Sequence, residues 1–111
     1  MVSDLDYVLI ARQYLKEILS TSQDLSDLSP AFFKRVCPSW NAKQCRTVLL
    51  AVHIALCDSV HDLADLAERV PEEPQAHKLW AEADHHHDVL GKLDAFLLRS
   101  YPREAYCYDQ A

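Results

Sequence analysis

The stretch ADLAERVPEEPQAHKLW, residues 64–80, decides how this chain folds. On both sides of Pro71–Pro74, apolar residues recur every three or four positions, which is the pattern of amphipathic helices. The two prolines interrupt helical hydrogen bonding and force a short turn. A short turn makes neighbouring helices antiparallel. The stretch therefore predicts a helical hairpin, with helices over about residues 42–70 and 75–100.

The apolar positions of these two helices match across the turn. The first helix has a series at heptad spacing, made of Cys45, Leu49, Val52, Leu56, Ser59, Leu63, Leu66 and Val70. The second has the series Leu79, Ala83, His86, Leu90, Leu93 and Leu97. Folding at the turn pairs Leu66 with Leu79, Leu63 with Ala83, Leu56 with Leu90, Val52 with Leu93, and Leu49 with Leu97. The same register sets Ser59 opposite His86, so we expect a polar layer there.

Shorter segments complete a small all-α bundle. Ser3 can cap an N-terminal helix over about residues 4–20, whose apolar positions are Val8, Ala11, Leu15 and Ile18. Ser29 followed by Pro30 resembles a cap and a first helical residue, which predicts a short helix over about residues 30–37. The N-terminal helix should pack far from the turn, on Val48, Ala55, Val89 and Phe96, and leave the turn end bare. We expect one helical domain, 1–111, whose aromatic tail, 101–111, packs on the bundle.

Composition supports this fold class and excludes several functions. The 111 residues include one glycine, Gly91. One glycine is too few for a hairpin-rich β fold and cannot form a phosphate-binding loop or a dinucleotide fingerprint. The longest run without charged residues, 47–57, is short for a membrane span, and the N-terminus lacks the basic residues of a signal peptide. We expect a cytoplasmic protein without membrane contact, whose cysteines are free thiols, namely Cys37, Cys45, Cys57 and Cys107.

Acidic residues concentrate in one part of the chain. The net charge is −6, but residues 58–88 alone carry nine acidic and two basic residues, a net of −7. The rest of the chain has eight acidic and nine basic residues, a net of +1. Because negative charge repels phosphates, we expect no direct nucleic-acid binding. The first hypothesis is a non-enzymatic interaction module of the inhibitor, immunity or adaptor type, which binds a basic protein surface.

One version of this hypothesis is that the protein blocks a partner that processes nucleic acids. The residues expected to contact the partner are Asp58, Asp62, Asp65, Glu68, Glu72, Glu73, Glu82 and His85. Opposite charge would accelerate the encounter between the two proteins. A long bare hairpin also suits a second copy of the chain, so a homodimer is a compatible expectation. No cofactor is expected.

The histidine run at 85–87 raises a metal-binding alternative. Successive helical residues point about 100° apart, so these three imidazoles cannot bind one ion. Glu82 and His85, however, have the spacing used in metal-binding helical bundles. Asp58 and Asp62 from the other helix would complete a set of three oxygen ligands and one nitrogen, acceptable to manganese, iron or zinc. The alternative function is therefore a metal-binding bundle with these four ligands.

Arg46 and His53 raise a further alternative, since residues seven apart share one helix face. The pair resembles the Arg-x4-6-His motif of the HEPN helical ribonucleases, which are small dimerising helical bundles. The resemblance covers these two residues, and Thr47 stands where that family usually has a polar amide, an acid or an imidazole. It implies a ribonuclease with Arg46 and His53 as catalytic residues. In the predicted register both also lie near Asp94 and Tyr101, which indicates a structural ion pair.

Cys57 suggests a nucleophilic role as a last alternative. It lies four residues from both His53 and His61, and an adjacent imidazole can activate a thiol. The sequence indicates no oxyanion hole, so a free core thiol is the expected state.

Overall fold

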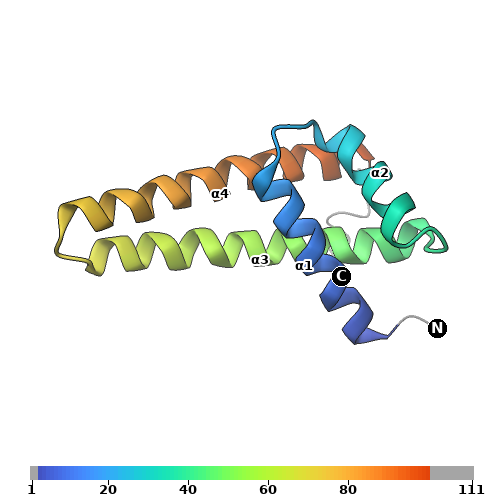
Figure 1. The fold of residues 1–111 in the computed structure, drawn as a ribbon, viewed down its shortest axis with the longest axis horizontal. Coiled ribbons are helices and arrows are strands. Elements are labelled where there is room, and N and C mark those ends of the chain that lie inside the picture. The colour runs from blue at the N-terminus through green and yellow to red at the C-terminus, as the bar shows by residue number, and fades with distance from the viewer. Residues whose placement is uncertain (1–2, 101–111) are drawn as a thin grey trace.

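The computed structural model describes residues 3–100, which form four α-helices. These are α1 (Asp4–Ser20), α2 (Leu25–Val36), α3 (Ala42–Arg69) and α4 (Glu73–Ser100). α3 and α4 form a long antiparallel hairpin, and α1 and α2 cover the end that lies away from its turn (Figure 1). The predicted all-α fold and hairpin are confirmed. The predicted packing of the tail, 101–111, lies outside the described residues.

Reciprocal capping explains where α1 and α3 begin. The Ser3 hydroxyl accepts a hydrogen bond from the Asp6 backbone, and the Asp6 carboxylate accepts one from the Ser3 backbone. Asn41 and Gln44 form the same pair of bonds at the start of α3. Such capping boxes satisfy backbone N–H groups that a helix leaves unpaired, and each cap contributes about 1 kcal/mol. Both helices begin where the sequence predicts.

The second helix begins earlier than predicted. The Asp24 carboxylate accepts a hydrogen bond of 2.7 Å from the Ser26 backbone, so α2 begins at Leu25 and Pro30 lies inside it. The prediction of a cap at Ser29 and a helix start at Pro30 is wrong. The Ser29 side chain is buried in the core, where it cannot cap a helix. Because Pro30 lacks a backbone N–H, α2 lacks one intrahelical hydrogen bond at this position.

The interface between α3 and α4 follows the predicted register over most of its length. Its most deeply buried residues are Leu49, Val52, Leu56, Leu93 and Leu97. Leu66 is an exception, because it is 50% exposed while its neighbour Ala67 is 3% exposed. A straight helix has 3.6 residues per turn, so its inward-facing stripe drifts away from a strict seven-residue repeat. The inward position near the turn is Ala67, and the prediction for Leu66 is wrong.

The inward face of α1 agrees with the predicted one at Ile18, Ala11 and Leu15 but not at Val8. Tyr14 and Ile18 are its buried residues, and Val8 is 51% exposed. Because α1 crosses α3 at an angle, its N-terminal part projects beyond the hairpin (Figure 1). The prediction that Val8 faces the core is therefore wrong. The predicted docking flank is buried at Val48, Val89 and Phe96 but exposed at Ala55.

An aromatic cluster holds α1 against α2. The Tyr14 ring lies 5.3 Å from Phe32 and 5.6 Å from Phe33, measured between ring centroids. The Tyr14 hydroxyl and the Ser29 hydroxyl are 2.6 Å apart and share a hydrogen bond. Both side chains are buried, so this bond satisfies two polar groups that water does not reach.

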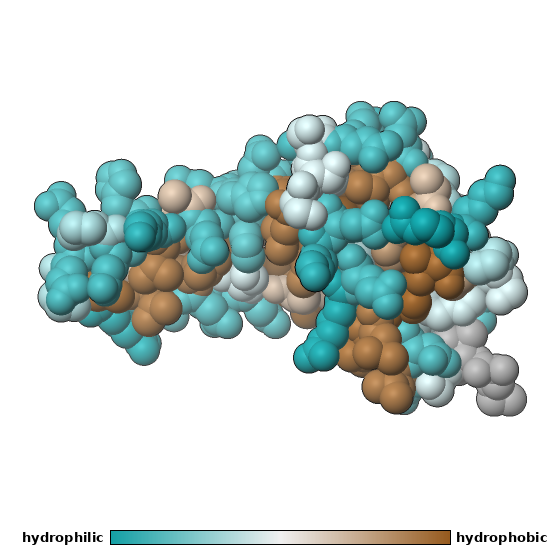
Figure 2. Space-filling model, viewed as in Figure 1, coloured by the Kyte–Doolittle hydropathy of each residue, from teal (hydrophilic) through white to brown (hydrophobic). Residues whose placement is uncertain are grey.

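Among the described residues, α3 is the helix that is long and apolar enough to cross a membrane, judged by length and composition alone. Only 22% of its most apolar 18-residue window is buried within the molecule. Figure 2 shows hydrophobic residues on the part of α1 that projects beyond α3, and a mostly hydrophilic surface around the turn end of the hairpin. Within residues 3–100, much of α3 is therefore left uncovered by the other helices.

Candidate functional site

The turn end of the hairpin carries the predicted partner-binding residues, and we call residues 58–88 the acidic lobe. α3 supplies Asp58, Asp62, Asp65 and Glu68, the turn supplies Glu72, and α4 supplies Glu73, Glu82 and His85. All eight are exposed. α1 and α2 lie over the opposite end of the hairpin (Figure 1). The lobe is a negatively charged protrusion, and its side chains are distributed around the hairpin.

His85 connects the acidic lobe to α1. Its Nε2 lies 2.8 Å from the backbone carbonyl oxygen of Leu19, in the last turn of α1. The last four carbonyl groups of a helix have no intrahelical partner, so a hydrogen bond donated by Nε2 satisfies one of them. His85 is thus engaged in packing between α4 and α1, which the sequence did not indicate.

The four side chains of the metal-binding alternative do not form a ligand set. Over residues 3–100, no group of three or more histidine, cysteine, aspartate or glutamate side chains is placed to hold a metal ion. His85 faces the Leu19 carbonyl, and Asp58, Asp62 and Glu82 are exposed to solvent. The structure therefore does not bring these proposed ligands together.

The predicted polar layer inside the hairpin is confirmed. The Ser59 hydroxyl oxygen lies 2.7 Å from Nδ1 of His86, which joins α3 to α4. Both residues are partly buried, so the hydrogen bond offsets the cost of placing polar groups in the interface. The histidine run thus divides: His85 binds α1, His86 binds α3, and His87 is exposed.

His53 forms a second polar connection across the hairpin. Its Nε2 lies 3.4 Å from a carboxylate oxygen of Asp94, and its Nδ1 lies 4.0 Å from the Cys57 sulfur. The predicted proximity of His53 to Asp94 is confirmed, and Tyr101 lies outside the described residues. Both ring nitrogens of His53 thus face groups within the hairpin, and the imidazole is 20% exposed. This arrangement supports a structural role for His53.

Cys57, His53 and Asp94 together have the residue types of a catalytic triad. The Cys57 thiol, however, lies in an environment that does not activate it as a nucleophile. Burial raises the pKa of Cys57, and the negative charges of Asp58 and Asp94 raise it further. The thiolate is the reactive form of cysteine, so this environment suppresses reactivity at neutral pH. The same desolvation raises the pKa of Cys37 to about 11.

We expect Cys57 to react with iodoacetamide more slowly than an unfolded cysteine peptide at neutral pH. Its rate should still be rising above pH ~8.5, where free cysteine is half ionised. Replacing the other three cysteines by serine isolates this thiol for mass spectrometry. Asp94→Asn should speed the reaction, because it removes a negative charge that opposes ionisation. Rapid labelling at neutral pH would show instead that the thiol is activated.

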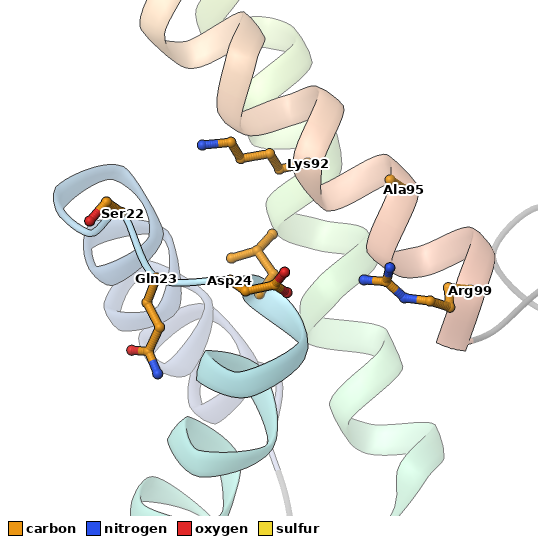
Figure 3. Close-up of a pocket in the computed structure, with 7 residues that line it drawn as sticks. Ser22, Gln23, Asp24, Lys92, Ala95 and Arg99 are labelled. Atoms are coloured by element: carbon orange, nitrogen blue, oxygen red, sulfur yellow. The ribbon is translucent and has the colours of Figure 1, made fainter.

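A polar pocket that the sequence did not indicate lies between the α1–α2 linker and α4 (Figure 3). It has a volume of about 320 Å³ and is lined by Ser22, Gln23, Asp24, Leu25, Lys92, Ala95 and Arg99. Hydrogen bonds from Ser26 lower the pKa of Asp24, and Arg99 lowers it further. Arg99 also donates a hydrogen bond to the Ser26 hydroxyl, and Lys92 lies 3.4 Å from Asp88. The Arg99 contacts join the start of α2 to the end of α4, whereas the Lys92–Asp88 pair lies within α4.

Comparison with family models, with curated proteins and with solved structures gives no match to this chain. Residues 58–88 carry a net charge of −7 against +1 for the rest of the chain, and the eight predicted contact residues of the acidic lobe are exposed.

Proposed function

We propose that this protein is an interaction module whose acidic lobe binds a basic surface of another protein. The observation that carries the proposal is the excess of nine acidic over two basic residues within 58–88. α1 and α2 lie over the opposite end of the hairpin (Figure 1), and α1 reaches this segment at His85 through the Leu19 carbonyl. The proposed contact residues are the eight exposed side chains of the acidic lobe named above.

Charge repulsion within the lobe supports a basic partner. Like charges held on one narrow protrusion repel each other and oppose compact folding. A basic surface would relieve this repulsion on binding, and the attraction would speed the encounter. Affinity also requires apolar side chains that become buried at the centre of an interface. Trp80 is 42% exposed and Leu66 is half exposed within the same lobe, and both suit this role.

Proteins that process nucleic acids present basic grooves to the phosphate backbone. An acidic protrusion that enters such a groove would exclude the nucleic acid. We therefore favour an inhibitor, immunity or adaptor role, without catalysis by this chain. A nuclease or a polymerase-like protein is the class of partner that fits this charge pattern best.

The test compares Glu72→Lys/Glu73→Lys, at the tip of the lobe, with Asp4→Lys/Asp27→Lys, outside it. Both double variants change the net charge equally, and all four residues are exposed. We expect the tip variant to bind its partner about ten-fold or more weakly, because attraction becomes repulsion. The control should bind as the wild type does. The partner is isolated on the immobilised wild-type protein, and titration calorimetry at two salt concentrations gives the affinities.

Trp80→Ala should also weaken binding while leaving its salt dependence unchanged, because it removes an apolar contact and no charge. Partner binding that survives reversal of the tip charges, and that does not weaken with salt, would show that the acidic lobe is not the interface.

A further inference from the structure

The side of α3 that faces away from α4 carries a self-complementary series of residues. Lys43, Ile54 and Asp65 are spaced eleven residues apart. Eleven residues make about three helical turns, so these side chains lie along one line of the helix. Ile54 is 54% exposed, and Lys43 and Asp65 are exposed. A positive, an apolar and a negative residue thus follow one another at equal spacing on an open face.

We propose that two copies of this chain associate through this face, with their α3 helices antiparallel and a two-fold axis at Ile54. Ile54 of each copy then packs against Ile54 of the other. Lys43 of each copy lies level with Asp65 of the other, which gives two equivalent ion pairs. Lys43 and Asp65 are 22 positions apart, and a rise of about 1.5 Å per position gives a contact about 33 Å long.

The charge distribution of α3 selects an antiparallel second copy as the occupant. Residues 42–57 contain Lys43 and Arg46 and no acidic residue, whereas residues 58–69 contain four acidic residues and Arg69. An antiparallel pair places each basic half against an acidic half, whereas a parallel pair would place Asp65 against Asp65. A two-fold interface uses the same surface on both copies, and the series described above meets that requirement.

The apolar character of α3 also supports a protein partner over lipid. Less than a quarter of its most apolar window is buried in the single chain. Beside Ile54, the side chain of Leu50 is partly buried and adds apolar surface to the face. Lys43, Asp58 and Asp65 on or beside this face would be costly in a hydrocarbon layer, but they can pair with opposite charges or stay solvated in a dimer.

Self-association goes beyond the proposed function and does not depend on it, and Asp65 is the one proposed partner-contact residue that also belongs to the dimer interface. In the antiparallel arrangement the two acidic lobes lie at opposite ends of the dimer. The tip residues Glu72 and Glu73 remain uncovered there, so the variants that test partner binding leave the dimer interface unchanged. Failure of one proposal can thus be distinguished from failure of the other.

The test uses two charge reversals that are complementary across the interface. Lys43→Glu should weaken the dimer by about ten-fold or more, because each of the two ion pairs becomes a carboxylate facing Asp65. Asp65→Lys should have a similar effect, because each pair becomes an ammonium group facing Lys43. In an equimolar mixture of the two variants, a heterodimer restores one native and one reversed ion pair. We therefore expect each variant alone to be more monomeric than the mixture.

Sedimentation equilibrium or light scattering measures the dissociation constants of the full-length protein and its variants. Ile54→Asp should abolish association, and Lys34→Glu, on the exposed side of α2, should leave it unchanged. Circular dichroism checks that each variant is folded. A monomeric wild type, a Lys43→Glu variant that dimerises as tightly as the wild type, or a mixture no more dimeric than its components would each overturn the proposal. So would binding of the wild type to neutral phosphatidylcholine vesicles in place of dimerisation.

Discussion

Replacing Leu56 by alanine is expected to lower the free energy of unfolding by about 2–5 kcal/mol, the usual cost of a cavity in a packed core. Leu56 is 0% exposed, at the centre of the contact between α3 and α4. The same substitution at Leu66 should cost about 1 kcal/mol or less, because half of that side chain is already in water. The two leucines lie in one predicted heptad series, so the sequence pattern alone does not distinguish them.

Urea unfolding followed by circular dichroism measures both variants at low protein concentration, where self-association adds little to stability. For a domain of this size each kcal/mol lost lowers the melting temperature by roughly 4–8 °C. If Leu56→Ala and Leu66→Ala lowered the free energy of unfolding equally, the result would contradict the inward position of Ala67 near the turn. A small loss at Leu56 would contradict the register of the whole hairpin.

The hairpin was predictable because the information that specifies it is local. Two periodic apolar series and a turn with two prolines determine which helices form and how they pair. The Ser59–His86 hydrogen bond followed from that register, as did the approach of His53 to Asp94. The prediction failed at Leu66. A strict seven-residue repeat departs steadily from the 3.6-residue turn of a straight helix, and α3 is 28 residues long. A shift of one residue along the sequence is enough to turn an inward position into an outward one.

Tertiary contacts determine the features that the sequence did not indicate. Pro30 favours a helix start, but the Asp24 cap and the burial of Ser29 place it inside α2. The orientation of His85 depends on where α1 ends, because its hydrogen-bond partner is the Leu19 carbonyl. The acidic composition of the lobe and the bare turn end were both predicted from the sequence, whereas the contact between His85 and α1 was not.

Tyr14→Phe is the second substitution for which we expect a large effect. It should lower the free energy of unfolding by about 1–3 kcal/mol, because it leaves the buried Ser29 hydroxyl without this partner. The two oxygens are 2.6 Å apart, and both side chains are buried between α1 and α2. The substitution removes one oxygen atom and keeps the ring that packs against Phe32 and Phe33. The loss therefore measures the hydrogen bond more than the packing.

A double-mutant cycle separates this bond from other effects of the two substitutions. Tyr14→Phe combined with Ser29→Ala should cost less than the sum of the single changes, because removing both partners leaves neither hydroxyl unpaired. Tyr7→Phe is the matched control on the same helix, since Tyr7 is partly exposed, and should be nearly neutral. Additive losses, within about 0.5 kcal/mol, would mean that the two hydroxyls do not interact. That result would contradict the hydrogen bond between the Tyr14 and Ser29 hydroxyl groups.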